Sequence, residues 1–521
     1  MIVELFSSLT ILLFLVFFIR KQWYYKLPPS PMALPIIGHL HLLGPLIHHS
    51  FREISSRYGP LIYLRLGSIS VVVASAPELA KELLKTHELT FSSRKHSIAI
   101  DHLTYNSSFA FAPYGPYWKF IKKISTFELL GNRMLTKFLP IRKQELHHFL
   151  GGFYSKSKVG ESVNITQELT KLSNNIISQM MLSMRSSDTD SEAEVARTVV
   201  REVTQIFGEF NVCDFIWFCR NIDLQGFRKR IDDIYSKYDG LLEKLITSRE
   251  ELRKQNRING AVHEAQDFLD IMLDVMEDEN AEIRLTRNHI KALFLDFFTA
   301  ATDTTAIAIE WALAELINQP EVLEKAREEI NRVVGNGRIA QESDNPNLPY
   351  IQAILKETFR LHPPIPMVAR KSIQDCKING YTIPANTLLF VNMWSIGRDP
   401  KYWKNPLQFQ PERFLQSNDD DGLTSSIDIR GQHYLLLPFG TGRRSCPGIS
   451  LAMQSMPTTL AVMIQCFDWK VVNPPGMEIK TGNSVLDMTE RPGLTAPRIR
   501  DLVCIPVPRL PAQVLDPICA N

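Results

Sequence analysis

The sequence predicts a mainly helical protein with small β-sheets and an N-terminal membrane anchor helix. Helical periodicity dominates from Trp118 to about Met276 and returns in the longest such pattern, from Thr286 to Asn318. Strand-like runs are short and lie near the two ends of the chain, so they can build only small sheets. An uncharged stretch at residues 5–19 precedes this body. No internal repeat is visible, and we expect residues 39–521 to form one domain.

The composition excludes some classes of protein. A chain of 521 residues can bury a large core, and 45% hydrophobic with 22% charged residues is ordinary for a globular protein. The 58 basic and 56 acidic residues leave a net charge of +2, which gives no electrostatic reason to expect nucleic-acid binding. The seven cysteines form no Cys-x-x-Cys pair and no zinc spacing, which indicates reduced thiols in a cytosol-facing protein.

The N-terminal apolar run predicts an uncleaved anchor. Counted from Met1, it has about the minimum length for a bilayer span at ~1.5 Å per residue. Glu4 precedes it and Arg20 and Lys21 follow it, the reverse of a cleavable signal. A cleaved secretory signal is the alternative. We expect residues 1–26 to be a single-pass transmembrane anchor with a basic flank that keeps the remaining chain in the cytosol.

The first elements after the anchor follow from local signals. Residues 27–38 are rich in proline and predict a stiff, extended hinge. Two β-rich runs between Leu61 and Ala74 flank Gly67, which predicts a hairpin. Residues 77–85 are expected to be helical, and residues 93–116 to lack regular structure.

The segment from Val212 to Phe227 is unusually aromatic. Two interpretations stay open for it. It could be a contact of the core, or a segment that dips into the membrane or admits substrate.

The longest helix begins at a candidate N-cap, Thr286, and is stopped by Pro320. At ~1.5 Å per residue it spans roughly 50 Å, enough to cross a whole domain. Its middle is apolar over much of its surface, so the helix must be buried. Strand signals return late, at residues 377–391 and 466–472.

The most specific chemical signal is the loop from Pro438 to Gly448. It holds a lone cysteine, Cys446, between glycines and prolines, and a helical stretch follows it. Gly442 and Gly448 would allow tight turns that a side chain would block. Backbone N–H groups and the start of the next helix would stabilise an anionic sulfur, as a metal-binding thiolate requires. A buried structural cysteine is the alternative.

A second signal lies within the long helix. Asp303 and Thr304 place an acid and an alcohol side by side in mid-helix, where both are poor choices for propensity. Threonine can bond the carbonyl four residues back and distort a helix locally. Beside bound oxygen, the pair could deliver protons and release water. Without the cysteine loop, a structural role would be the usual explanation.

The spacing Phe-x-x-Gly-x-Arg-x-Cys-x-Gly resembles the haem-binding loop of the cytochrome P-450 family. The resemblance extends over nearly the whole chain and implies that family's fold. It implies haem b as cofactor, with Cys446 as the axial thiolate ligand of the iron. Phe439 and Gly448 would contact the haem from the same loop. Ala300–Thr305 resembles the family's oxygen-activation motif, with Asp303 and Thr304 as catalytic residues. Ala301 replaces the usual glycine, and its methyl group would narrow the oxygen groove.

The resemblance also implies partners for the two haem propionates. Trp118 and Lys122 have the family's Trp-x-x-x-basic spacing, Arg444 comes from the cysteine loop, and Arg370 matches a further contact. Each basic residue alone would be interpreted as surface solvation, whereas together they predict a ring around one macrocycle.

Other polar residues are expected to be structural. Glu357 and Arg360 are three apart on a helix, and with Arg413 they resemble the family's Glu-Arg-Arg triad, which locks the segment before the cysteine loop. The histidines show no competing ligand spacing and are interpreted as ordinary polar residues: His48, His49, His147, His148, His362 and His433.

Within the family, the body is similar to plant microsomal members and to the flavone synthase II group, also called flavanone 2-hydroxylases. The stretches that carry this similarity are 91–96, 109–118, 300–305 and 490–495. It implies a flavanone whose C2–H faces the iron, and a 2-hydroxyflavanone or flavone product. The implied substrate-binding positions are mostly apolar, with packing as the alternative for each: Ser97, Leu103, Phe297, Ala301, Thr305, Met367, Val368, Leu494 and Thr495.

The resemblance further implies use of O2 and NADPH through a membrane-bound NADPH–cytochrome P-450 reductase, at the endoplasmic reticulum. Alternatives are the same chemistry on another plant phenolic or a triterpenoid, including isoflavone formation by aryl migration. A haem-thiolate protein that binds without oxidising, and a reductase-independent lyase or isomerase, are further alternatives. The acid–alcohol pair argues against both of these.

Overall fold

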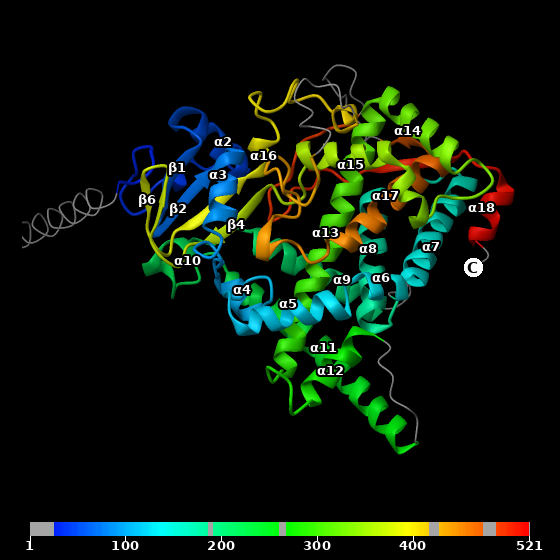
Figure 1. Ribbon diagram of the computed structural model, residues 1–521. Helices are drawn as coiled ribbons and strands as arrows, with labels where there is room; N and C mark the ends of the chain where they lie inside the picture. The colour runs from blue at the N-terminus through cyan, green and yellow to red at the C-terminus, as the bar shows by residue number, and fades with distance from the viewer. Residues whose placement is uncertain (1–25, 186–190, 260–266, 416–426, 473–485, 520–521) are drawn as a thin grey trace, which may run out of the picture.

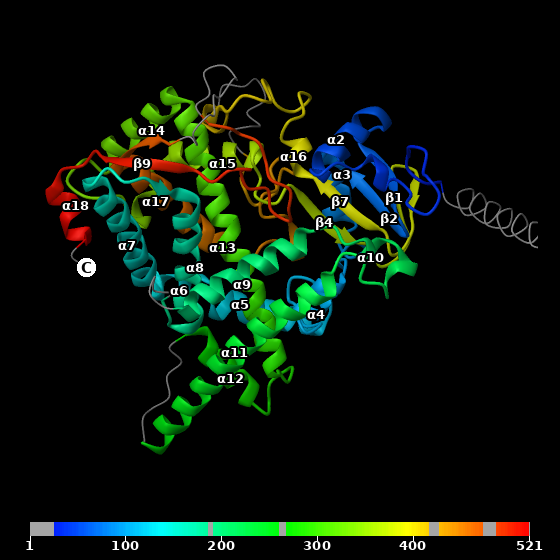
Figure 2. The same ribbon diagram turned by 180° about the vertical axis from the view of Figure 1, so that it is seen from behind.

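The computed structural model describes residues 26–185, 191–259, 267–415, 427–472 and 486–519. The predicted anchor therefore lies outside the described residues, apart from Lys26. Helices make up most of the molecule, and the strands lie in two places, with β1, β2, β4 and β7 at one side and β9 toward the other (Figures 1 and 2). The α-helices are α2 Ile47–Tyr58, α3 Pro77–Lys81, α4 Ile98–Leu103, α5 Pro116–Glu128, α6 Asn132–Lys137, α7 Leu139–Lys158, α8 Ile165–Leu182, α9 Ser191–Gly208, α10 Val212–Phe215, α11 Phe227–Ile258, α12 Phe268–Glu277, α13 Arg287–Asn318, α14 Pro320–Val333, α15 Pro349–Leu361, α16 Met393–Ile396, α17 Ile449–Cys466 and α18 Ala512–Cys519.

The strands form small sheets, as the sequence predicts. The largest has the order β1-β2-β7-β4, and β2 and β7 run parallel while the other pairs are antiparallel. A second sheet has the order β3-β9-β8, and β5 pairs with β6. The bounds are β1 Leu61–Leu66, β2 Ile69–Ala74, β3 Val163–Asn164, β4 Met367–Lys371, β5 Cys376–Ile378, β6 Tyr381–Ile383, β7 Leu388–Asn392, β8 Phe467–Val471 and β9 Val503–Pro508.

Helix α13 crosses the middle of the molecule and packs against α8 and α17 (Figures 1 and 2). Thr286 and His289 form a capping box at its start, and Pro320 begins α14 directly after its end. Within the described part of the chain, α13 is the one helix long and apolar enough to cross a membrane, and most of it is buried inside the protein. The prediction of a long buried helix is therefore confirmed.

The β1–β2 hairpin is also confirmed, with Gly67 at φ +60° in the turn. Elsewhere the structure differs from the prediction. Residues 93–116 contain α4, whose first turn is capped by the Ser97 hydroxyl at 3.2 Å from the Ile100 nitrogen. Helix α3 ends in a π-helical turn, Glu82–Thr86. Strands β3, β4 and β9 have no counterpart in the prediction.

The aromatic segment at 212–227 does not enter the core with its largest side chains. Trp217 is 74% exposed and Phe218 is 49% exposed, although Cys213 and Cys219 are buried. A core contact is therefore wrong for both aromatic residues. The segment lies against the β1–β2 turn, where the Ser68 nitrogen donates to the Phe215 carbonyl at 2.8 Å.

Candidate active site

The loop before α17 folds around Cys446 through two left-handed glycines. Gly440 and Gly442 have φ of +66° and +70°, and a Cβ on Gly442 would lie 2.2 Å from Oε1 of Glu88. The Cys446 N–H donates to the Phe439 carbonyl at 2.8 Å, which closes the loop. Gly448 has an ordinary φ of −84°, and a Cβ there would meet only the Cys446 sulfur at 3.7 Å. The expectation that a side chain would block the turn at Gly448 is therefore wrong.

Cys446 is solvent-accessible, although the protein around it is close enough to desolvate its thiol. It is exposed, whereas five other cysteines are buried: Cys213, Cys219, Cys376, Cys466 and Cys504. Burial among surrounding protein raises the pKa of the Cys446 thiol, while a hydrogen bond from the Gly448 N–H and the charge of Lys122 lower it. The loop thus presents one accessible sulfur with an N–H group and a cation beside it.

Cations gather next to this loop on the Trp118 side chain. The Arg444 guanidinium lies 4.5 Å from the centre of the indole ring, and Lys122 Nζ lies 5.0 Å from it. Arg444 donates to the carbonyls of Ser92 and Ala112 at 3.1 and 2.5 Å. Lys122 donates to the carbonyl of Arg443. The structure therefore brings together Trp118, Lys122 and Arg444, which the sequence places in two distant segments.

Arg370 and a residue that the prediction omits, Arg94, complete the cluster. Arg370 donates to the Arg444 carbonyl at 3.4 Å, and burial with the charges of Arg94 and Arg444 holds its pKa well below the usual value. Burial lowers the pKa of Arg94 to about 10. Burial, together with repulsion from the charge of Arg94, lowers the pKa of Arg444 to about 9. Arg94 Nε and Arg444 Nη1 are buried and have no hydrogen-bond partner among the described residues. Sequence alone offered only the similarity of the stretch 91–96 as a signal for Arg94.

This cluster fits a prosthetic group that carries carboxylates. The nearby acid, Glu88, is already paired with Arg443 at 2.5 Å. Buried guanidinium groups without partners are costly unless an anion satisfies them. An accessible sulfur beside such groups suits a metal macrocycle with acidic side chains, so the residues present fit haem b, with Cys446 toward the iron and the cations toward the propionates.

In α13 the side chains of Asp303 and Thr304 point in different directions. The Thr304 hydroxyl donates to the Ala300 carbonyl at 2.8 Å, and Ala300 is exposed although α13 is largely buried. Burial raises the pKa of Asp303, while a hydrogen bond from Thr204 and the charges of Arg491 and Arg201 lower it. Consecutive residues of a helix point about 100° apart. Asp303 therefore faces α9 and the C-terminal segment rather than the Thr304 hydroxyl.

The Glu-Arg-Arg residues meet as the sequence predicts. Fully buried Arg360 donates to both carboxylate oxygens of Glu357 at 2.7 Å, and Arg413 Nε donates to Glu357 at 3.0 Å. Arg360 also donates to the carbonyls of Pro406 and Gln408 at 2.6 and 3.0 Å. These bonds fix the irregular chain that leads toward the cysteine loop.

The predicted substrate positions fall into different environments. Phe297 is buried and stacks with Phe109, which stacks with Trp118, so an aromatic row joins α13 to the cation cluster. Val368 points to the same face of β4 as Arg370, because strand residues alternate, whereas Met367 packs on the other face with the core beneath α2. The remaining positions divide by exposure: Leu103 and Thr495 are buried, Ser97, Ala301 and Thr305 are half-buried, and Leu494 is 40% exposed.

An accessible thiol beside two buried guanidinium nitrogens without hydrogen-bond partners would suit a haem-thiolate site in a mainly helical fold. The family model described as "Cytochrome P450" matches residues 28–495. The chain therefore belongs to the cytochrome P450 family, and it is a monooxygenase of the plant type.

Individual relatives agree with this assignment. The chain is 60% identical to cytochrome P450 93B16 of Glycine max, over 94% of this chain and 93% of the relative. It is also 60% identical to cytochrome P450 93B2 of Gerbera hybrida, with the same coverage. A 2-hydroxyisoflavanone synthase of Glycine max is 49% identical, over 93% of this chain and 92% of the relative. A zebra fish cytochrome P450 in a structure with progesterone superimposes with a TM-score of 0.73 at 27% identity, covering 90% of this chain and all of that one.

Proposed function

We propose that this monooxygenase oxidises a flavanone at C2, giving a flavone or a 2-hydroxyflavanone, with O2 and with electrons from NADPH through a cytochrome P-450 reductase. A sequence resemblance supports the flavanone, and the ordering of identities argues against the isoflavonoid alternative. The chain shares 60% with 93B16 and 93B2 but only 48–49% with 2-hydroxyisoflavanone synthases. The flavone synthase II resemblance of residues 91–96 and 490–495 points the same way.

Haem b, when bound, supplies the redox-active iron for O2 activation. The chain's own contribution begins at Cys446, whose thiolate would be the iron ligand, favoured by the Gly448 N–H and by Lys122. Arg94, Arg370 and Arg444 would neutralise the propionates. Binding these anions would also relieve the mutual repulsion of the guanidinium groups.

Thr304 and Asp303 would handle protons at different points. The Thr304 hydroxyl is oriented by its bond to the Ala300 carbonyl, which leaves its lone pairs free to accept a hydrogen bond at the open face of α13. Burial raises the pKa of Asp303, whose carboxyl group faces Thr204 and two arginines. This carboxyl group would bind a proton on the Thr204 side of α13 and donate it to a neighbouring acceptor.

A flat, largely apolar guest suits the side chains assigned to substrate binding. Leu103, Phe297 and Val368 are buried and apolar, and the Ala301 methyl group would limit the space beside Thr304. Thr305, Met367, Leu494, Thr495 and Ser97 stay candidates for contacts at the edge of the substrate.

We further propose that residues 1–26 anchor the protein in the endoplasmic reticulum membrane, that 27–38 form the hinge, and that 39–521 are the cytosolic catalytic domain. The described chain begins beside β6, where the Thr382 nitrogen donates to the Lys26 carbonyl at 2.7 Å. Helix α10 lies at this same end of the molecule (Figure 1), and the exposed Trp217 and Phe218 follow it directly in sequence. Such an apolar patch would suit contact with the membrane that holds the anchor.

The test is incubation of reductase-coupled microsomes with naringenin. A flavone or 2-hydroxyflavanone that requires both NADPH and O2 is expected. An isoflavanone product, or no product, rejects the flavanone assignment, and turnover without NADPH favours an isomerase instead.

A further inference from the structure

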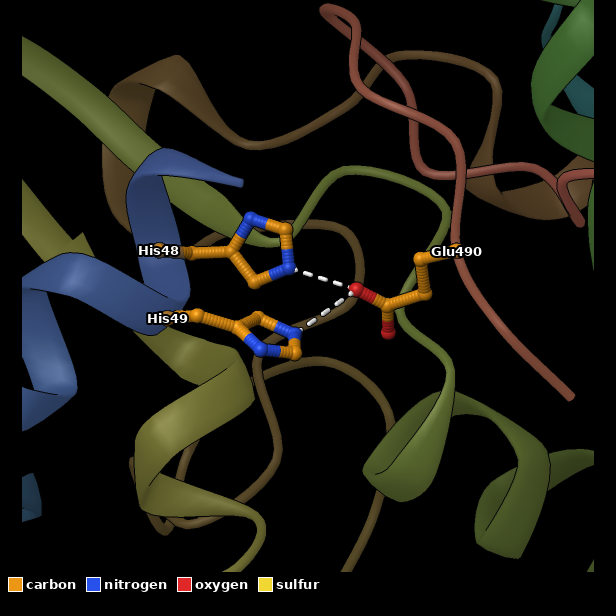
Figure 3. Close-up of side chains that lie close together, drawn as sticks. All are labelled: His48, His49 and Glu490. Atoms are coloured by element: carbon orange, nitrogen blue, oxygen red, sulfur yellow. Dashed lines mark hydrogen bonds and ion pairs between the residues drawn. The ribbon is translucent and has the colours of Figure 1, made fainter. Parts of the chain in front are cut away.

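We propose that His48, His49 and Glu490 form a divalent-metal site that takes Zn²⁺. The site is separate from the haem and does not depend on the proposed substrate. Among the described residues, these three side chains form the group of possible metal ligands, and their ligand atoms all lie within 4.8 Å of one another. Both imidazole rings point at one carboxylate oxygen of Glu490 (Figure 3).

The side chains of His48, His49 and Glu490 meet at one carboxylate oxygen, although Glu490 is far from the histidines in sequence. His48 Nε2 and His49 Nε2 lie 2.6 and 3.2 Å from Glu490 Oε2, and His48 is 442 positions from Glu490. The histidines come from the first turn of α2, and Glu490 comes from the segment after β8. Glu490 and His48 are buried, whereas the His49 side chain is 43% exposed. The site therefore has a closed inner side and an accessible outer side.

The surroundings hold the ligands as metal sites require. The Trp394 indole N–H donates to the other Glu490 oxygen at 2.8 Å, and the Asn392 amide donates to the His48 carbonyl at 2.8 Å. Partners of this kind orient ligating carboxylates and histidines. His49 also stacks on Trp394, with 4.0 Å between ring centres.

A zinc ion fits with a small adjustment. Bonds of ~2.1 Å around a tetrahedral ion separate its ligand atoms by roughly 3.4 Å. His48 Nε2 and Glu490 Oε2, which lie 2.6 Å apart, must therefore separate by about 0.8 Å, and no pair of ligand atoms must close by more than about 1.4 Å. The exposed His49 ring can make this movement. A surface hollow of about 360 Å³, lined by His49, Arg52, Glu53, Ser56 and Trp394, adjoins the site and leaves room for a water ligand.

The donor set selects the class of ion. Imidazole nitrogens and a carboxylate suit Zn²⁺ better than Mg²⁺ or Ca²⁺, which prefer oxygen ligands. Arg398 and Arg52 lie 4.0 and 5.5 Å from the Trp394 ring, and their charges oppose a cation. We therefore expect a dissociation constant of roughly micromolar size rather than the far tighter values of closed structural zinc sites.

The experiment measures zinc bound per haem iron in purified, chelator-treated holoenzyme. The protein is equilibrated with ZnCl2 at about ten micromolar, and the Zn:Fe ratio is read by elemental analysis after rapid gel filtration, with the dissociation constant from calorimetry. A ratio near one is expected for the wild type. His49→Ala, at a half-exposed position, should weaken binding at least tenfold, and Glu490→Gln should do the same.

The matched control is His148→Ala. It alters a second His–His dipeptide, His147–His148 in α7, which belongs to no cluster of this kind among the described residues. It should bind zinc like the wild type. Wild-type protein without bound zinc overturns the proposal. So does a His49→Ala variant whose Zn:Fe ratio and affinity match the wild type.

Discussion

Arg94→Gln should weaken haem retention without destabilising the rest of the fold. Arg94 Nε is buried without a partner among the described residues, and burial lowers the pKa of this guanidinium from 12.5 to about 10. At about 1.4 kcal/mol per pKa unit, the charge costs roughly 3.5 kcal/mol while no anion faces it. A propionate would recover this through a charge-assisted hydrogen bond of about 1.5–3 kcal/mol. Losing that bond corresponds to roughly a tenfold to hundredfold faster haem loss.

The assay is the rate of haem transfer to excess apomyoglobin, followed by the shift of the haem absorption band. The control is Lys95→Gln, which removes a neighbouring cation that lies 3.8 Å from the Phe215 ring, outside the Arg94–Arg370–Arg444 cluster. Lys95→Gln should lose haem at the wild-type rate. If Arg94→Gln also loses haem at the wild-type rate, the cluster does not bind the propionates through Arg94.

Other substitutions test separate parts of the site. Thr304→Ala should keep consuming NADPH while the product per NADPH falls severalfold, because the hydroxyl at the open face of α13 is lost; unchanged coupling contradicts a proton role. Glu357→Gln leaves fully buried Arg360 without its carboxylate partner and removes the ion pair between Glu357 and Arg413, which should cost about 3–5 kcal/mol, seen as a lower Tm and lower haem content; a wild-type Tm would show that the triad is dispensable. Burial raises the pKa of Asp296 from 3.8 to about 7, so between these values the folded state holds a proton that the unfolded state lacks. Wild-type stability relative to Asp296→Asn should therefore fall as pH rises from 5 to 7 and level off above that, and a Tm difference independent of pH refutes this.

Local signals predicted the parts of the fold that depend on local chemistry. The Gly67 turn, the capped start of α13 and the Glu357–Arg360 spacing are encoded within a few residues, and the structure has each of them. Strand β4 was missed because a strand is stabilised by its partner, here β7, which periodicity does not reveal.

The residues of the candidate active site also depend on contacts between distant segments that the sequence does not reveal. Spacing located Cys446, Lys122 and Arg444, but the membership of Arg94 depends on a fold that brings it beside Arg444. Adjacency in sequence also suggested that Asp303 and Thr304 act side by side, whereas helix geometry turns them toward different neighbours.

The most direct measurement is the carbon monoxide difference spectrum of the reduced, haem-containing protein, compared with that of Cys446→Ala. A thiolate-type Soret band in the wild type, absent from Cys446→Ala, is the expected result. A wild-type band of the imidazole-ligand kind, or a thiolate band that survives in Cys446→Ala, would show that another residue binds the iron.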